Sequence, residues 1–532
     1  MSEDTGRELI RGLLRAEAYP HATGTIEVRE THISWIILTG SFAYKIKKPV
    51  NFGFVDFSTA DRRRFFCEEE VRLNRRLAPG LYLGVVTITG SATTPRISGD
   101  GPVLEHAVRL RQFDPNASFD RLAHTRSIEA NHIDRLADLL ASFHRTAPKA
   151  SRDSPWGTAE STGTAMRETL DELARRIDSP VERRQLVALI DWNERRESEL
   201  RRLLEQRKAG GFIRECHGDL HLGNLVMLDG EPTPFDCLEF NASLRWIDIV
   251  SEIAFLTMDL HISGAGPLAY RFIDRYEQAV GDYAGLRLLR YYQVYRALVR
   301  AKVAALSSPP NRGGITDEDS ERVRRAYLDY ACMTAGCRPT APGASSRSAL
   351  LVTHGLSGSG KSSLAAQIAE RLPAIRLRSD VERKRLFADD RNGPDAPHLY
   401  SANATRRTYR RLAKLAATVL DLAMPIIIDA TFLARWQRDT MHELARRHGI
   451  PFVVLDLVAP THLLRERIRK RASDGADPSD ATEAVLMRQI ALREELAPDE
   501  EPARLAIDAA APDIEALLSA IRERCNRLIA PP

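Results

Sequence analysis

Three features that would each assign a protein to a particular class are rare or missing in the sequence: paired cysteines, long apolar stretches and a leader-like N-terminal pattern. Its six cysteines include no CxxC pair, so their spacing indicates neither a disulfide framework nor a zinc site, and a reducing compartment is expected. No stretch of the sequence approaches the roughly 20 apolar residues that a membrane span requires. The N-terminal residues also lack the basic and then apolar pattern of a secretory leader. We therefore expect a cytoplasmic location.

Net charge is also small. The 76 lysines and arginines nearly balance the 72 aspartates and glutamates, which leaves +4, so the composition implies no obligate polyanion partner and any basic function must be local. With 43% hydrophobic and 28% charged residues, the sequence is typical of a globular protein. A length of 532 residues predicts two to four domains at about 150 residues per domain.

The best candidate for a linker is the stretch GCRPTAPGASSRS. It is rich in Pro, Gly, Ser and Ala, has no hydrophobic periodicity, and lies between a helical segment and the apolar run that begins at Ala349. We therefore predict an N-terminal domain over residues 1–338, a linker over 339–348 and a C-terminal domain over 349–532.

The two predicted domains differ in the order of their elements. In the first, WIILTGSFAYKIKKPV reads as a strand hairpin and is followed by a charged helix, whereas residues from about 127 onward are mostly helical. This pattern predicts an α+β domain with a small β-rich lobe before a larger α-rich lobe. In the second domain, short apolar strands alternate with helices, which predicts an α/β domain with a parallel sheet covered on both faces.

The C-terminal domain carries a phosphate-binding loop. GLSGSGKS satisfies the pattern GxxxxGK[ST] and lies between a buried strand and a helix. Its backbone N–H groups would point at phosphate oxygens, Lys361 would neutralise the β and γ phosphates, and the Ser362 hydroxyl would hold Mg²⁺. The sequence therefore predicts binding of ATP or GTP with Mg²⁺. The candidate nucleotide contacts in the loop are Gly355, Ser357, Gly358, Ser359, Gly360, Lys361, Ser362 and Ser363.

Further polar residues follow the loop. Asp380 could accept the proton of an attacking hydroxyl, and Arg383 could bind a substrate phosphate or acid; alternatively they are a helix N-terminal aspartate and a solvated arginine. Asp429 ends a buried strand, at the edge where α/β sheets bind ligands, and is a candidate ligand of Mg²⁺ or of the substrate. Arg467 and Arg471 precede a loop rich in Gly, Asp and Pro and could close over the transferring group, or they belong to a solvated charged helix.

These motifs occur in the order seen in P-loop kinases of the polynucleotide-kinase and zeta-toxin type, which the chain resembles over about residues 347–520. The resemblance implies an α/β kinase domain that uses ATP and Mg²⁺. It implies ATP and Mg²⁺ binding by Lys361 and Ser362, a catalytic base at Asp380, a substrate contact at Arg383, and lid arginines at Arg467 and Arg471.

A second constellation lies in the N-terminal domain. HGDLHLGN places Asp219 and Asn224 in one loop, and Asp236 follows beyond a short hairpin. In kinases with this arrangement one aspartate orients and deprotonates the acceptor hydroxyl, while the asparagine and a second aspartate hold Mg²⁺. The segment resembles the aminoglycoside phosphotransferase branch of the protein-kinase-like fold, most clearly over about residues 210–260. The resemblance implies a catalytic base at Asp219, metal ligands at Asn224 and Asp236, and a buttress for the loop at Asp248.

A kinase fold also needs a lysine for the nucleotide phosphates and a helix glutamate that holds it. Strand alternation puts Lys45 and Lys47 on one face, so periodicity leaves both open, whereas the kinase AxK spacing selects Lys45. Glu69 and Glu70 both border the apolar stripe of the next helix, and the family spacing favours Glu70. The alternative is a solvated edge lysine and a solvated helix face.

Together these observations predict a bifunctional ATP-dependent phosphotransferase that acts on small hydroxyl-bearing acceptors. The whole arrangement resembles bacterial proteins in which an aminoglycoside-phosphotransferase domain is fused to a P-loop ATP-binding domain. Two alternatives stay open for the C-terminal domain: a nucleotide-dependent switch that regulates the kinase, and a nucleic-acid end kinase that binds through ATRRTYRRLAK. The balanced total charge favours a small-molecule acceptor over nucleic acid.

Overall fold

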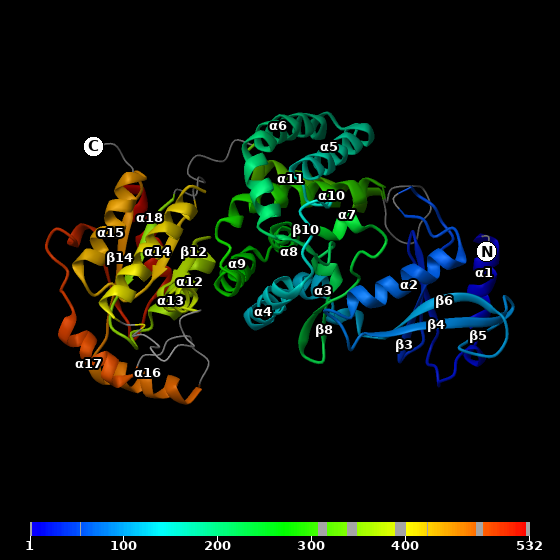
Figure 1. Ribbon diagram of the computed structural model, residues 1–532, viewed down its shortest axis with the longest axis horizontal. Coiled ribbons are helices and arrows are strands. Elements are labelled where there is room, and N and C mark those ends of the chain that lie inside the picture. Colours follow the sequence, from blue (N-terminus) through cyan, green and yellow to red (C-terminus); the bar gives the residue numbers. More distant parts are fainter. Residues whose placement is uncertain are drawn as a thin grey trace. The chain divides into compact units, whose positions relative to one another are not determined.

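The computed structural model of the chain describes residues 3–53, 55–306, 317–337, 348–388, 399, 401–422, 424–474 and 482–527 (Figure 1). It divides into two compact units. The first unit comprises Met1–Ala265 and Leu288–Cys337, and the second comprises Gly266–Arg287 and Arg338–Pro532. The second unit therefore takes in a segment, residues 266–287, that the sequence placed in the N-terminal domain. The predicted linker, residues 339–348, lies outside the described residues except for Ser348.

The first unit begins with a six-stranded sheet in the order β1-β2-β3-β6-β4-β5, in which every neighbouring pair is antiparallel. Alternating side chains of the predicted hairpin pack on opposite faces: Trp35 and Ile37 lie in the core beside α1, and Ala43 lies in the core beside Cys67 of α2. The strands and helices of this lobe are α1 (Glu3–Gly12), β1 (Glu27–Glu30), β2 (Ser34–Leu38), β3 (Phe42–Lys47), α2 (Ala60–Asn74), β4 (Tyr82–Ser91), β5 (Thr94–Ile97) and β6 (Val103–Arg111).

The remainder of the first unit is mostly helical, as the sequence predicted. Its centre is α8 (Ile249–Ile262), in which every residue up to Leu260 is buried. Such a helix lacks a polar face because other elements cover it on all sides. The other elements are α3 (Phe119–His124), α4 (Ala130–Thr146), α5 (Ala159–Arg176), α6 (Pro180–Ala209), β7 (Ile213–Glu215), β8 (Leu225–Leu228), β9 (Glu231–Pro234), α7 (Ala242–Arg245), β10 (Trp246–Asp248), α10 (Leu289–Leu306) and α11 (Asp317–Ala335).

The second unit is built on a five-stranded sheet in the order β12-β13-β11-β14-β15, and all its neighbouring strands are parallel. The predicted parallel sheet is thus confirmed. Its central strands are buried along nearly their whole length, as expected where helices cover both faces. The elements are α9 (Gly266–Val280), β11 (Leu350–His354), α12 (Lys361–Arg371), β12 (Ile375–Arg378), α13 (Ser379–Leu386), α14 (Ala402–Leu420), β13 (Ile426–Asp429), α15 (Arg435–Arg447), β14 (Phe452–Val458), α16 (Thr461–Asp474), α17 (Glu483–Leu492), β15 (Arg504–Asp508) and α18 (Ile514–Arg527).

Within the part of the chain that the structure describes, every helix is too short or too polar to cross a bilayer.

Candidate active sites

The predicted catalytic loop of the first unit connects β7 to β8. The side-chain amide of Asn224 donates one hydrogen bond to the Asp219 carboxylate (Nδ2–Oδ2 3.0 Å) and another to the Asp219 carbonyl (2.9 Å). His217 is buried, and its Nε2 lies 2.9 Å from the Phe235 carbonyl oxygen. The structure thus brings Asp219 and Asn224 together and leaves about a third of the Asp219 side chain exposed (32%), so an acceptor could reach it.

Glu252 of α8 holds this loop from behind. Its carboxylate accepts hydrogen bonds from the backbone N–H groups of His217 and Gly218, both at 2.8 Å, and lies 3.3 Å from Nε2 of His144 on α4. Burial alone would raise the pKa of Glu252, but His144 and the Gly218 N–H stabilise the carboxylate and lower its pKa to about 2. A charged, fully buried carboxylate therefore fixes the backbone just before Asp219.

His144, Cys216 and Glu252 bring three potential metal-ligand atoms to within 4.8 Å of one another. The chemistry of the group does not favour a metal. Both oxygens of Glu252 already accept backbone hydrogen bonds, and Cys216 donates to the Ile247 carbonyl (3.7 Å). Burial raises the pKa of the Cys216 thiol well above its ordinary value, which disfavours the thiolate that a metal requires. We assign the group to support of the catalytic loop.

Asp248, the residue that the family resemblance implied as a buttress, contacts other groups. Its carboxylate forms a buried fork with Arg207 of α6 (2.6 and 2.8 Å) and accepts the Val250 N–H (2.9 Å) at the start of α8. It therefore fixes the helix that carries Glu252. Sequence reasoning did not single out Glu252, because nothing local distinguishes a glutamate in an apolar helix from a solvated one.

His221 and Arg300 lie close to the Asp219 carboxylate. Nε2 of His221 lies 3.5 Å from the Asp219 carboxylate, and Nη1 of Arg300 on α10 lies 3.3 Å from the same nitrogen. Burial would raise the pKa of Asp219, but His221 and Arg300 together lower it below its ordinary value. Asp219 is therefore charged at neutral pH. A carboxylate of low pKa is a weak base, which suits phosphoryl transfer, where positioning contributes more than proton abstraction.

The structure places Lys45, Glu70 and Asp236 in one cluster. Nζ of Lys45 lies 2.8 Å from Oε1 of Glu70 and 2.5 Å from Oδ1 of Asp236. The pKa of Lys45 is raised well above its ordinary value because Asp236 and Glu70 outweigh the opposing effect of burial. The Asp236 side chain is 43% exposed, so this end of the cluster is open to a ligand.

Lys47, the lysine that strand alternation left open, is enclosed. Its Nζ lies 2.7 Å from Oε2 of Glu70 and pairs with Glu239, and its side chain is fully buried. Burial would raise the pKa of Glu70, but the two lysines lower it to about 2. For Glu239, burial outweighs Lys47 and raises the pKa. Since only Lys45 also reaches Asp236, the geometry favours Lys45 as the lysine that faces the nucleotide.

Gln112 fixes the loop between β2 and β3. Its Oε1 accepts hydrogen bonds from the backbone N–H groups of Thr39 (3.0 Å) and Gly40 (2.9 Å). Gly40 has φ +97°, a conformation that favours glycine. The contact joins residues far apart in the sequence, so no local pattern predicted it.

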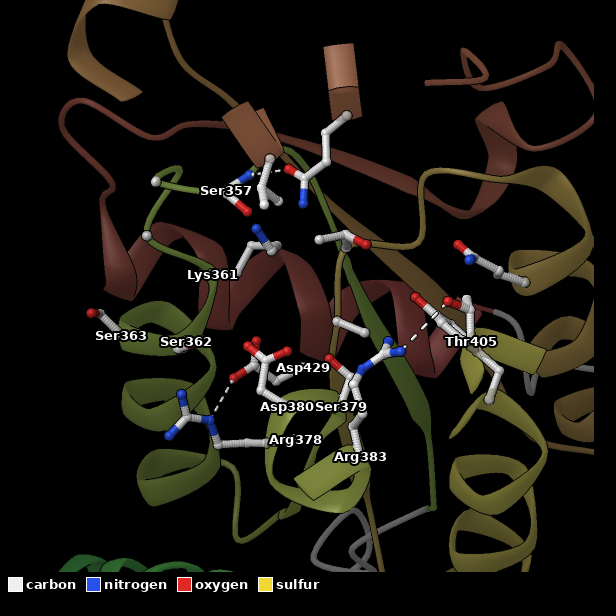
Figure 2. Close-up of a pocket in the computed structure, with 18 of the residues that line it drawn as sticks. Ser357, Lys361, Ser362, Ser363, Arg378, Ser379, Asp380, Arg383, Thr405 and Asp429 are labelled. Atoms are coloured by element: carbon white, nitrogen blue, oxygen red, sulfur yellow. Dashed lines mark hydrogen bonds and ion pairs between the residues drawn. The ribbon is translucent and has the colours of Figure 1, made fainter. Parts of the chain in front are cut away.

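In the second unit, the phosphate-binding loop connects β11 to α12 (Figure 2). Gly358 has φ +84°, and a Cβ atom added there would lie 2.6 Å from the Leu464 carbonyl oxygen. Only glycine fits this position. Nζ of Lys361 donates to the Leu356 carbonyl (2.7 Å), so the lysine folds back over the loop.

The loop borders a pocket of about 340 Å³. Gly355 and Ser359 of the predicted set do not line it, and the side chain of Arg471 lies outside the described residues. The pocket is lined by the predicted residues Ser357, Gly358, Gly360, Lys361, Ser362, Ser363, Asp380, Arg383, Asp429 and Arg467, and by Arg378, Ser379, Thr405, Tyr409, Ala430, Thr431, Gln437, Val485 and Gln489.

Two arginines of the edge strand β12 face Asp429 of β13. Nε of Arg378 lies 3.3 Å and Nη1 of Arg376 lies 3.8 Å from Oδ2 of Asp429, and Figure 2 shows the Arg378 contact. The arginines partly neutralise this carboxylate, and its role as a Mg²⁺ ligand stays a prediction. The signal that could have revealed them is the run IRLR, because alternate arginines in a buried strand need partners.

Arg383 and Arg467 reach the pocket from different elements. Arg383 of α13 donates to the Leu399 carbonyl (2.6 Å). It also lies 3.5 Å from the Thr405 hydroxyl, a contact that Figure 2 shows. Arg467 of α16 donates to the Ala509 carbonyl (2.9 Å). Gln489 of α17 was not predicted, and its Oε1 accepts the N–H of Ser357 in the loop (2.8 Å). The pocket thus combines arginine and lysine side chains with the carboxylates of Asp380 and Asp429.

Comparison with known proteins finds a family match for two parts of the chain. Residues 58–289 match the phosphotransferase enzyme family, and residues 350–496 match the AAA domain. The chain thus carries one region similar to each of these two families. It is a kinase, and the predicted fold class is confirmed for both parts. An uncharacterized protein of Mycobacterium tuberculosis is 29% identical over 470 residues, which cover 87% of this chain and 89% of the relative.

Solved structures also align with each part of the chain. A gluconokinase from Sinorhizobium meliloti is 21% identical and covers 34% of the chain and 93% of its own length, with a TM-score of 0.26. The amicoumacin kinase hAmiN, solved with AMP-PNP, Ca²⁺ and Ami, is 12% identical and covers 63% of the chain and 97% of its own length, with a TM-score of 0.39.

Proposed function

We propose that each unit binds Mg·ATP and transfers its γ-phosphoryl group to a hydroxyl of a small molecule. The observation that carries the proposal is the cluster of the first unit, where Lys45 reaches both Glu70 and Asp236 while Asn224 holds Asp219. These side chains come from β3, α2 and two separate loops, and they are the residue types that phosphoryl transfer uses for positioning and charge neutralisation.

In the first unit, Lys45 would bind the α and β phosphates and Glu70 would keep it in place. The carboxamide oxygen of Asn224 and the carboxylate of Asp236 are hard oxygen donors, which fit Mg²⁺. When bound, Mg²⁺ neutralises the charge that develops on the phosphates. The acceptor oxygen forms its bond to the γ-phosphorus as the bond to the bridging oxygen of ADP breaks, and the hydroxyl proton passes to the Asp219 carboxylate.

In the second unit, Lys361 and the loop N–H groups would hold the phosphates. Ser362 and Asp429 offer a hydroxyl and a carboxylate in the pocket, a donor set that fits Mg²⁺. Because Arg378 already pairs with Asp429, we assign the metal first to Ser362. Asp380 would take the acceptor proton, and Arg383 would bind an anionic group of the acceptor.

The size of the pocket and its arginines favour a small anionic alcohol as the acceptor of the second unit. A pocket of about 340 Å³ suits a metabolite rather than a strand of nucleic acid. We also propose a cytoplasmic location. All six cysteines lie in the described part of the chain and carry free thiols, which supports a reducing compartment.

The test is to incubate the wild-type chain, Asp219→Ala and Lys361→Ala with a metabolite extract and γ-labelled ATP. We expect two sets of labelled products, one lost in each variant. Slow ATP hydrolysis without labelled product would favour the nucleotide switch. Labelling of oligonucleotide ends that weakens steeply with salt would favour the nucleic-acid end kinase.

A further inference from the structure

The helix α9 belongs to the phosphotransferase match by sequence and to the second unit by structure. Residues 58–289 match the phosphotransferase family, yet Gly266–Arg287 is compact with the second unit. An ion pair between Arg271 of α9 and Glu370 of α12 (3.2 Å) is one of its attachments there. The helix that follows the phosphate-binding loop therefore has a neighbour that the C-terminal sequence does not supply.

The spacing of two side chains on α9 matches the spacing of two arginines on the edge strand β12. Asp274 and Gln278 are one turn apart on α9, a rise of about 6 Å, and Arg376 and Arg378 are two residues apart on β12, a rise of about 6.6 Å. Asp274 accepts a fork from Arg376, at 3.2 Å from Nε and 2.8 Å from Nη2. Gln278 lies 3.5 Å from Nη1 of Arg378. Each arginine thus meets one side chain of α9.

The ion pair between Asp274 and Arg376 is nearly enclosed, with side chains 10% and 8% exposed. Burial lowers the pKa of Arg376, and Asp274 and Asp429 more than restore it, so the net shift is upward. A buried guanidinium without a counter-charge is strongly unfavourable. Asp274, together with Asp429, therefore supplies the negative charge that allows an arginine to occupy this strand.

Arg376 connects this pair to the phosphate-binding loop. Its Nη1 donates to the backbone carbonyl of Ser362 (2.8 Å) and lies 3.8 Å from the Asp429 carboxylate. We propose that Asp274 is a positioning residue for the nucleotide site of the second unit, because it orients the guanidinium that fixes Ser362 and faces Asp429. Without Asp274, Arg376 turns toward Asp429, its nearest remaining anion, and releases the Ser362 carbonyl.

This inference rests on the proposed nucleotide binding of the second unit. It implies that the second unit is complete only with a helix encoded before residue 288. The complementarity of the two spacings also identifies the contact as specific, since a helix displaced by one residue would bring neither side chain to an arginine.

The test uses the full-length chain with Lys45→Met, so that nucleotide binding reports on the second unit. Calorimetry with AMP-PNP and Mg²⁺ would measure affinity for that background and for Asp274→Asn. We expect Asp274→Asn to weaken binding about ten-fold, as is typical when the partner of a ligand-orienting group is removed. The matched control is Glu370→Gln, which removes the ion pair between Arg271 and Glu370 and should change affinity by less than about two-fold.

A double-mutant cycle with Arg376→Met separates positioning from general destabilisation. If Asp274 acts through Arg376, Asp274→Asn will add no further loss in the Arg376→Met background. Equal losses in both backgrounds, or unchanged affinity of a folded Asp274→Asn, would overturn the proposal. If Asp274→Asn does not fold, Arg376→Lys keeps the charge but cannot bridge Asp274 and Ser362, and it must weaken binding for the proposal to stand.

If the second unit does not bind nucleotide at all, the result will differ from that expected when only the role of Asp274 is wrong. The Lys45→Met chain would then not bind AMP-PNP, and Lys361→Ala would change nothing.

Discussion

Lys45 of β3 and Glu70 of α2 form a buried ion pair in which Nζ lies 2.8 Å from Oε1. The second oxygen of Glu70 binds Lys47, so one carboxylate serves two lysines with different exposure. Lys45 is 12% exposed and Lys47 is fully buried. The arrangement separates a lysine that can meet a ligand from one that supports the structure.

We therefore expect Lys45→Met to impair catalysis and Lys47→Met to impair stability. Lys45→Met should lower the kcat/KM of the first unit by about 100-fold or more, because it removes the cation that faces the nucleotide. Lys47→Met should lower the free energy of unfolding by about 3 kcal/mol, because Glu239 and Glu70 stay buried with one cation fewer. Steady-state kinetics and urea titrations of both variants would check this. Equal kinetic losses in two folded variants would contradict it.

The Asp219 carboxylate accepts the Asn224 amide at 3.0 Å, and its replacement by an amide keeps the shape of the loop. Asp219→Asn should lower phosphorylation by the first unit by about 1,000-fold, since the carboxylate that orients the acceptor hydroxyl and takes its proton is lost. Nucleotide affinity should stay within about two-fold, because Asp219 is not assigned to the nucleotide. Product labelling and calorimetry on the same preparation would test both statements. Lys361→Ala is the control, and it should leave this activity intact.

The loops that form the two candidate sites could be located from the sequence, because the signals that mark them are local. The two glycines of the GxxxxGK[ST] pattern, Gly355 and Gly360, have φ of +145° and +86°, a conformation that favours glycine, and Asp219 and Asn224 lie in one short loop. Such constraints act over a few residues, so a motif records them.

The residues that support the two candidate sites could not be predicted, because their roles depend on contacts between segments that are distant in the sequence. Glu252 of α8 accepts a hydrogen bond from the backbone of the loop that carries Asp219. Asp274 pairs with Arg376, which lies much later in the sequence. Each is an acidic residue in a helix, a pattern that is most often solvated. Only burial distinguishes them, and burial is a property of the folded unit.

The buried carboxylate of Glu252 predicts a dependence of stability on pH. Its pKa is about 2 in the folded chain and 4.5 ordinarily, so its contribution is present above pH 4.5 and is lost as the pH falls toward 2. Integrated over that window, the contribution is about 3 kcal/mol. Urea titrations should show the first unit losing stability as the pH falls, with a smaller loss in Glu252→Gln.

Glu172 provides the control for this pH dependence. Its pKa is also lowered to about 2, by Arg175 and Arg176 on the surface of α5. Solvent screens such pairs, so Glu172→Gln should leave the pH dependence of stability unchanged. If Glu172→Gln and Glu252→Gln flatten it equally, burial is not the cause of the effect.

Gly358 and Gly449 provide a matched pair for the phosphate-binding loop. Both have positive φ, +84° and +62°, but an added Cβ at Gly358 would lie 2.6 Å from the Leu464 carbonyl, whereas at Gly449 nothing lies within 4 Å. Gly449→Ala should therefore cost about 1 kcal/mol of stability from backbone strain alone and leave AMP-PNP affinity unchanged. Gly358→Ala must also move the loop backbone, and we expect it to weaken AMP-PNP binding by the second unit at least about 30-fold. If calorimetry in the Lys45→Met chain gave the two alanine variants the same affinity, the close contact of the loop with α16 would not be what shapes the phosphate site.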